Sequence, residues 1–172
     1  MKVKVTPSKV HGNVKIPASK SMAHRALICA SLSDGTSIVS NVTNSKDIEA
    51  TVGCMKALGA KIKQIDETTY EVTGTKLFKQ EGNITCNANE SGSTLRFLIP
   101  LAACTNAKVK FLGQGRLLQR PMDVYENEFK EQNIEFNQSD KEIIVRGNLQ
   151  AKDYVVQGDI SSQFITGFMF VL

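Results

Sequence analysis

The chain has 172 residues, of which 41% are apolar and 22% are charged, a composition that argues against disorder and fits a folded globular protein. The net charge of +4 is too small to indicate nucleic-acid binding by itself, although it suits an acidic small molecule. The longest unbroken apolar run, residues 167–172, is too short to span a bilayer, and the N-terminus has no apolar signal segment. A reducing cytoplasm is therefore the expected compartment.

The cysteines and histidines give little support to a metal site or a disulfide. The four cysteines are separated by 25, 32 and 18 residues and include no C-x-x-C pair, which favours buried thiols. The two histidines, His11 and His24, lie in no partner pattern, so a surface or structural role is expected for both. We expect no metal.

The first predicted unit begins with a short strand in the sequence VKIP. A polar loop then leads to a helix with apolar residues spaced i, i+4, i+7 and i+8 from Met22. After a second strand, Asp47 is placed to cap another helix, and Gly59 stands where that helix should end. A hairpin completes the unit, with strands at residues 61–65 and 69–73.

The second unit repeats the same order. A strand and a polar loop precede an apolar helix that begins near Ser93. Another strand follows, and Pro121 suits the first turn of a helix that holds Phe129. Residues 134–136 and 142–145 then predict a second hairpin.

Spacing supports an internal repeat. Helix-opening aspartates are 76 residues apart, hairpin-closing glycines are 73 apart, and helix-opening serines are 72 and 69 apart. These landmarks are Asp47 and Asp123, Gly74 and Gly147, and Ser21, Ser93 and Ser162. We interpret them as an α/β (α+β) fold in which a βαβαββ unit of roughly 70–75 residues occurs twice in full and begins a third time. The very apolar helix at the end of the third unit lacks a following strand, so residues 1–172 are expected to be one domain truncated in that unit.

The motif Lys20-Ser21-x-x-x-Arg25 is the first candidate for chemistry. Ser21 and Arg25 share one helical face, and Lys20 adds a charge beside free backbone N–H groups at the helix start. Such a terminus attracts anions. Taken alone, the motif fits a capped surface helix with solvated bases better.

Equivalent helix starts in the other two units change that balance. The second unit brings Gly92, Ser93 and Arg96, and the third brings Ser161, Ser162 and Gln163. A structural cap needs one hydroxyl or carboxylate and no arginine, so three such starts favour an anion pocket. Arg120 follows a glycine-rich loop and is a candidate clamp for a carboxylate or phosphate, although a solvated loop arginine is an equal alternative.

The segments KSMAHRALICASLSDGTS, SGSTLRFL, QRPM and GDISSQF occur in this order, and together they resemble the 5-enolpyruvylshikimate-3-phosphate synthase family from Lys20 to Gln163. The resemblance implies the N-terminal part of a two-domain enzyme with the enolpyruvyl transferase inverse α/β barrel. It also implies that residues 1–12 belong with the absent C-terminal domain. Members transfer the enolpyruvyl group of phosphoenolpyruvate to the 5-hydroxyl of shikimate 3-phosphate, in aromatic amino acid biosynthesis, and need no cofactor.

The resemblance also assigns roles to residues. It implies shikimate 3-phosphate binding by Lys20, Ser21, Arg25, Ser161, Ser162 and Gln163, phosphoenolpyruvate binding by Lys20, Gly92 and Arg120, and possible support from Ser93 and Arg96. The family's acid–base residues fall outside this chain, so no catalytic residue is assigned, and the fragment is expected to be inactive alone. The implied partners are the two substrates and the other domain of a monomeric enzyme, with no nucleic acid or membrane.

Two departures from the family pattern concern the phosphoenolpyruvate side. Many members have Asn-Ala-Gly-Thr where this chain has Glu90-Ser91-Gly92-Ser93, and many have proline where this chain has Phe97. The pocket wall is therefore expected to differ there. Members with glycine at the position of Gly92 are generally sensitive to glyphosate, which is the expectation for the parent enzyme.

Two alternative functions remain open. The related transferase that acts on UDP-N-acetylglucosamine typically has asparagine after the first lysine and a catalytic cysteine in a glycine-rich loop. Here Ser21 follows Lys20, and residues 113–121 contain no cysteine. A non-enzymatic anion- or nucleic-acid-binding domain of related fold would need exposed aromatic residues for stacking. Tryptophan is absent, and most of the eleven phenylalanines and tyrosines occupy core-like positions.

Overall fold

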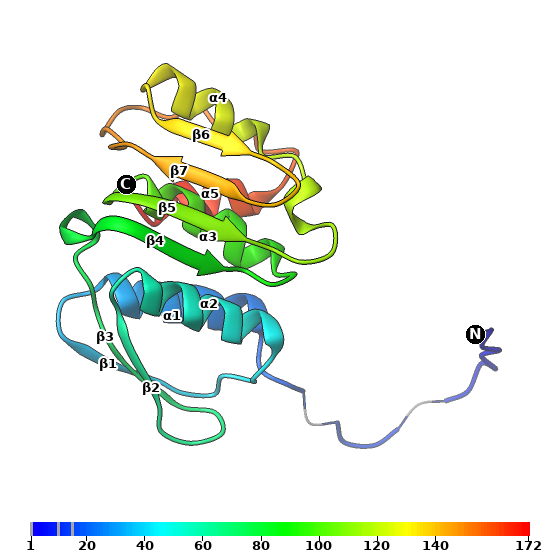
Figure 1. Ribbon diagram of the computed structural model, residues 1–172. Coiled ribbons are helices and arrows are strands. Elements are labelled where there is room, and N and C mark those ends of the chain that lie inside the picture. The colour runs from blue at the N-terminus through cyan, green and yellow to red at the C-terminus, as the bar shows by residue number, and fades with distance from the viewer. Residues whose placement is uncertain (1, 10, 15) are drawn as a thin grey trace.

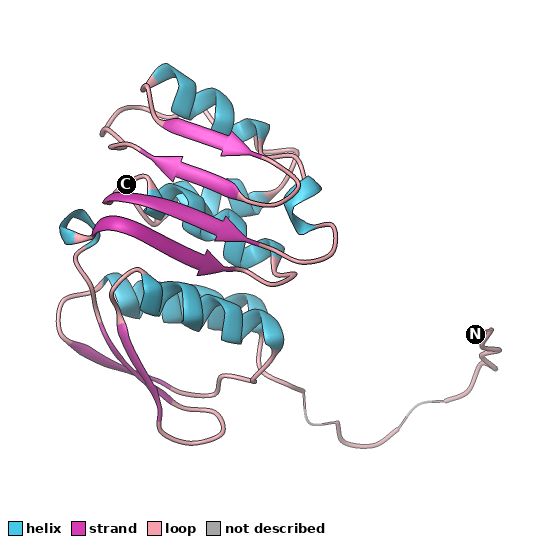
Figure 2. Ribbon diagram, in the orientation of Figure 1, coloured by secondary structure: helices cyan, strands magenta, loops and turns pink. Residues whose placement is uncertain are grey.

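The computed structural model describes residues 2–9, 11–14 and 16–172, which form two sheets and five α-helices (Figures 1 and 2). Helices α1 (Lys20–Leu32) and α2 (Lys46–Ala57) lie between the two sheets in Figure 1. Within this described part, none of the helices has both the length and the apolar character needed to cross a membrane.

The first sheet is antiparallel and has the strand order β1-β3-β2. Its strands are β1 (Thr36–Val39), β2 (Lys61–Gln64) and β3 (Tyr70–Thr73). Strands β2 and β3 form the predicted first hairpin, and α1 packs against β1 and β3. Ile62 and Val72 point into the core and are buried, as expected for strands with one face covered.

The second sheet has the order β4-β5-β7-β6. Its strands are β4 (Glu81–Asn87), β5 (Asn106–Leu112), β6 (Glu135–Gln138) and β7 (Ile143–Arg146). Strands β4 and β5 are parallel and are joined by α3 (Gly92–Ala102), whereas β6 and β7 form the predicted second hairpin. Helix α4 (Asp123–Glu131) packs against β6, and α5 (Ser162–Met169) packs against α3. Two short 3-10 helices, η1 (Leu77–Lys79) and η2 (Leu117–Gln119), complete the described elements.

The repeat and the α/β class are confirmed, with one correction. The second unit has the full βαβαββ order, β4-α3-β5-α4-β6-β7. The first unit contains α1-β1-α2-β2-β3 and lacks the leading strand predicted in VKIP. In the described part of that segment, Val14 and Ile16 are 85% and 83% exposed and are paired with no strand. A strand is stable only where a neighbouring edge accepts its hydrogen bonds, and here the position beside β1 is open.

The third unit departs from the prediction in the same way. Helix α5 forms, but no strand precedes it in residues 154–158, where Val155 is 90% exposed. The described residues do not close into a barrel. The buried apolar residues of all three units nevertheless form one continuous cluster, including Leu27 of α1, Leu98 of α3 and Phe164 of α5. One core therefore fixes the helices relative to one another.

Candidate functional site

The starts of α1, α3 and α5 converge, as the repeat predicted. Nε2 of Gln163 donates to Oγ of Ser93 at 2.8 Å, and Nη1 of Arg96 donates to Oε1 of Gln163 at 2.9 Å. Nη2 of Arg25 donates to Oγ1 of Thr166 at 3.1 Å. Side chains from three repeated positions, 67 to 141 residues apart, therefore form one polar cluster.

In each unit the N-cap is a different serine from Ser21, Ser93 or Ser162, and one of these caps, Ser161, is itself a predicted site residue. Ser19, Ser91 and Ser161 are the N-caps of α1, α3 and α5, and each accepts a backbone N–H from the first turn. Ser21, Ser93 and Ser162 lie inside the helices. The simple explanation of these serines as structural caps is therefore wrong, because a neighbouring serine already fulfils that need in every unit.

Asp47 also has a different place from the predicted one. The N-cap of α2 is Ser45, whose hydroxyl accepts the N–H of Ile48 at 3.3 Å. The Asp47 carboxylate lies in the first turn and pairs with Nζ of Lys20 at 2.5 Å. The pair is partly exposed, so its net strength is small and Lys20 can exchange it for another anion.

The backbone of Gly92 forms the floor of a positively charged corner. A Cβ added at Gly92 would overlap Nη1 of Arg120 and would lie 3.4 Å from Nη1 of Arg96. Burial and the nearby positive charge of Arg120 lower the pKa of Arg96 below its ordinary value. Within the described chain, no carboxylate forms an ion pair with either arginine. Two like charges brought together without a counter-charge are suited to an anionic ligand.

Arg25 is held in place by α1 itself and by α3. Its Nη1 donates to the Ser21 carbonyl at 2.9 Å and to the Ser21 hydroxyl at 2.6 Å. The guanidinium lies over the Phe97 ring, 4.9 Å from its centroid. The departure from the family pattern at Phe97 thus has a structural effect, because an aromatic face supports the arginine.

Arg120 lies at the end of η2, and a side chain from the second sheet fixes its backbone. Nε2 of Gln138 on β6 donates to the carbonyls of Leu118 and Arg120 at 2.7 and 2.8 Å. No sequence pattern indicates this role, since Gln138 is an ordinary polar residue at the end of a hairpin strand. Pro121 precedes α4 and is not in its first turn, which corrects the prediction made for it.

A buried chain of hydroxyls lies beneath the site and was also missed. Nδ1 of His24 is 2.7 Å from Oγ1 of Thr51, which is 2.7 Å from Oγ1 of Thr94, which is in turn 2.7 Å from Oγ of Ser91. These contacts join α1, α2 and α3. Burial lowers the pKa of His24 to about 4, so the ring is neutral near pH 7. Of the surface and structural roles expected for His24, the structure supports the structural one.

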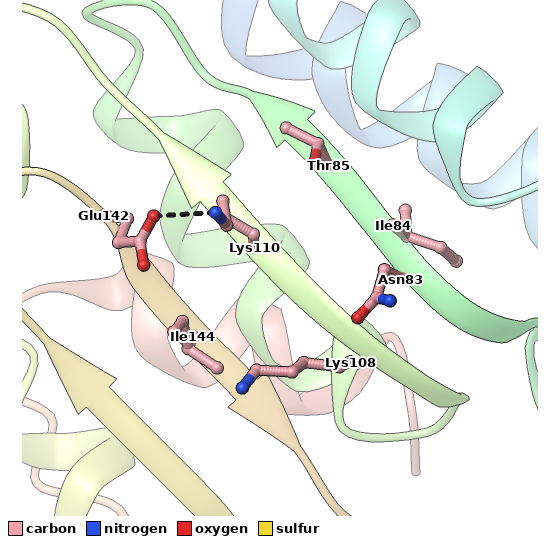
Figure 3. A pocket seen from close by; sticks show the side chains of 7 residues that line it. All are labelled: Asn83, Ile84, Thr85, Lys108, Lys110, Glu142 and Ile144. Atoms are coloured by element: carbon pink, nitrogen blue, oxygen red, sulfur yellow. Dashed lines mark ion pairs between the residues drawn. The ribbon is translucent and has the colours of Figure 1, made fainter.

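A hollow outside this cluster has a different character. It lies on the outer face of the second sheet and is lined by Asn83, Ile84, Thr85, Lys108, Lys110, Glu142 and Ile144 (Figure 3). Lys110 pairs with Glu142 at 3.0 Å, and Lys108 pairs with Glu135 at 3.8 Å. Because its cations already have carboxylate partners, this hollow is a poorer anion site than the helix starts.

Comparisons with known proteins point to the same family as the sequence motifs. The sequence model described as EPSP synthase (3-phosphoshikimate 1-carboxyvinyltransferase) matches residues 4–172. A protein of Clostridium perfringens (strain SM101 / Type A) named 3-phosphoshikimate 1-carboxyvinyltransferase is 46% identical over 173 residues, which cover 99% of this chain and 41% of that protein. A protein of the same name from Clostridioides difficile (strain 630) is 44% identical over 183 residues, again covering 99% and 41%.

Solved structures support the fold. EPSP synthase from Acinetobacter baumannii superposes with a TM-score of 0.78 and 18% sequence identity, over 92% of this chain and 38% of that one. This similarity concerns the arrangement of elements and says nothing about individual side chains. The chain spans about two fifths of the length of the curated relatives that it matches.

Proposed function

Because the chain belongs to the EPSP synthase family, we propose that it carries the shikimate 3-phosphate half of an enolpyruvyl transferase site. In the complete protein, the enolpyruvyl group of phosphoenolpyruvate would pass to the 5-hydroxyl of shikimate 3-phosphate, with release of phosphate. The observation that carries the proposal is the corner at Gly92, where Arg96 and Arg120 meet and, among the described residues, neither forms an ion pair with a carboxylate. Both substrates are polyanions and would supply the missing negative charge.

The polar cluster divides naturally between the two ligands. Shikimate 3-phosphate is assigned to Ser21 and Arg25 of α1, to Lys20, and to the α5 start, where Ser161, Ser162 and Gln163 lie. Phosphoenolpyruvate is assigned to Lys20, which both ligands would share, and to Gly92 and Arg120, which lie next to each other at the start of α3. Ser93 and Arg96 are assigned a supporting role, because each contacts Gln163 directly.

The chemistry explains why so many donors are fixed in advance. Charge develops on the substrates as the tetrahedral intermediate forms, and pre-oriented N–H and O–H groups stabilise it without reorganisation. Lys20 contributes a mobile charge that its exposed pair with Asp47 leaves available. No residue of this chain is assigned as general acid or base, and we place those groups on a second domain that closes over the helix starts.

The wider setting is part of the same proposal. Residues 1–172 would form the N-terminal domain, with residues 1–12 joining the other domain. The complete enzyme would be a cytoplasmic monomer in aromatic amino acid biosynthesis, and this chain alone would turn over neither substrate. Measurable phosphate release from both substrates by the isolated chain would contradict the last statement.

A titration of the chain with shikimate 3-phosphate, followed by amide NMR, tests the central claim. We expect saturable shifts near Ser21, Ser93 and Ser162, and their loss in Arg25→Ala. Arg146→Ala is the matched control, because Arg146 is an exposed arginine on β7. UDP-N-acetylglucosamine and a single-stranded oligonucleotide serve as competing ligands. Tighter binding of either one, or unchanged spectra at millimolar shikimate 3-phosphate, would contradict the proposal.

A further inference from the structure

Helix α3 contains a proline in its interior, at Pro100. In an α-helix, the N–H of residue i+4 bonds to the carbonyl of residue i. Pro100 has no N–H, so the carbonyl of Arg96 loses its helical partner. A buried carbonyl without a hydrogen bond costs free energy, so another donor is needed.

Tyr125 supplies that donor. Its hydroxyl comes from α4 and donates to the Arg96 carbonyl at 2.6 Å, while the Phe164 carbonyl of α5 lies 3.3 Å away. The Tyr125 side chain is fully buried, and its ring packs against Phe129, Phe164 and Phe168. Burial raises the pKa of the Tyr125 hydroxyl, so it keeps its proton and remains a donor.

The space for the hydroxyl depends on a glycine in α5. A Cβ added at Gly167 would overlap the Tyr125 hydroxyl and would lie 2.8 Å from the Arg96 carbonyl oxygen. Gly167 therefore lets α5 approach α3 closely at the point where Tyr125 inserts. Three elements are joined there by one hydroxyl group.

The two carbonyls next to Tyr125 belong to residues at the site or adjacent to it. Arg96 itself binds the Gln163 amide, and Phe164 follows Gln163 in the chain. We propose that Tyr125 is a positioning residue: it replaces the hydrogen bond that Pro100 removes and thereby holds the Arg96 and Gln163 side chains in register for the ligand. The ligand-binding part of this inference rests on the proposed function, whereas the hydrogen-bond replacement does not.

A double-mutant cycle in the full chain tests the replacement. Tyr125→Phe keeps the ring and removes the donor, so we expect the folding equilibrium constant to fall about tenfold. Pro100→Ala restores the N–H at position 100, and in that background the same tyrosine substitution should cost about twofold or less. An equal loss in both backgrounds would overturn the proposal. If Tyr125→Phe does not fold, recovery of folding in the double variant supports the proposal, and failure to recover overturns it.

A second readout connects the hydroxyl to the site. Shikimate 3-phosphate binding should weaken about tenfold in Tyr125→Phe and should return to within about twofold in Pro100→Ala/Tyr125→Phe. Tyr154→Phe is the matched control, because its hydroxyl also donates to a carbonyl, that of Gln150, at 2.5 Å. Weakened binding without rescue would overturn the positioning role. A wild-type chain that binds no shikimate 3-phosphate would refute the proposed function. The folding cycle would still test whether the Tyr125 hydroxyl replaces the hydrogen bond that Pro100 removes.

Discussion

Nη1 of Arg96 donates to Oε1 of Gln163 at 2.9 Å and joins the start of α3 to that of α5. Because a guanidinium only donates, this contact fixes the Gln163 amide with its oxygen toward Arg96 and its nitrogen toward Ser93. The amide N–H groups are then on the side of the helix-start hydroxyls, where an anionic ligand needs donors.

Gln163→Glu should separate stability from ligand binding. The new carboxylate has nearly the same shape and forms an ion pair with Arg96, so the midpoint of thermal unfolding should stay equal or rise. The same charge repels a phosphate, and shikimate 3-phosphate affinity should fall at least about tenfold. Calorimetric titration and a thermal melt measure the two effects. Unchanged affinity would show that Gln163 does not face the ligand.

Gly92→Ala should block the corner between the two arginines. The added methyl overlaps the end of the flexible Arg120 side chain and leaves the surrounding backbone clear, so the fold accepts it, and alanine favours a helix start no less than glycine. Phosphoenolpyruvate binding to the complete enzyme should weaken about tenfold or more, because Arg120 is displaced. Shikimate 3-phosphate binding should change much less. Steady-state kinetics of the complete enzyme with each substrate varied separately would measure the difference, and equal effects on both would contradict the assignment of Gly92.

His24 should make the chain less stable as the pH falls. Its pKa is about 4 when folded and about 6.5 when unfolded, with burial as the main cause. The unfolded chain therefore binds more protons between these values, and the neutral ring contributes stability that is full above pH 6.5 and lost as the pH falls toward 4. The difference amounts to about 3 kcal/mol. Asp47 opposes the shift, whereas Lys20 and Arg25 add to it.

Urea unfolding between pH 7 and pH 4.5 checks this prediction. Because carboxylates titrate in the same range, the comparison is between the wild type and His24→Gln, whose side chain is neutral throughout. The free energy of unfolding should fall more steeply in the wild type. His11→Gln is the control, because His11 is exposed, and parallel curves for wild type and His24→Gln would refute the buried-histidine explanation.

The sequence predicted most of the fold because its signals were local or repeated. The hairpins at β2–β3 and β6–β7 followed from alternation around polar turns, and the convergence of Ser93 with Gln163 followed from equivalent positions in like units. The prediction of a leading strand in the first unit was wrong, because the alternation of apolar and polar residues does not reveal whether a neighbouring strand edge is present. The sequence carries the pattern, while the open side of β1 is a property of the assembled sheet.

The supporting contacts of the site could not be predicted for a related reason. Tyr125 and Gln138 act on backbone carbonyls that are distant in the sequence, and no residue pattern marks such a carbonyl. Pro100 was visible inside an apolar helix, but its consequence depends on which side chain reaches the Arg96 carbonyl. The N-caps were misassigned because each helix start has two serines one or two positions apart. Only the backbone angles show which serine is the cap and which lies in the first helical turn.

The hydroxyl chain under the site should behave as one unit. Thr51 stands in its middle, 2.7 Å from both His24 and Thr94, so Thr51→Val leaves two buried groups without that partner and should cost about 1–3 kcal/mol. Thr94→Val should cost a similar amount. The double variant removes both hydroxyls together and should cost clearly less than the sum, because the orphaned partner is then also gone. Chemical denaturation of the four proteins measures the coupling, and strict additivity would show that the hydroxyls act independently.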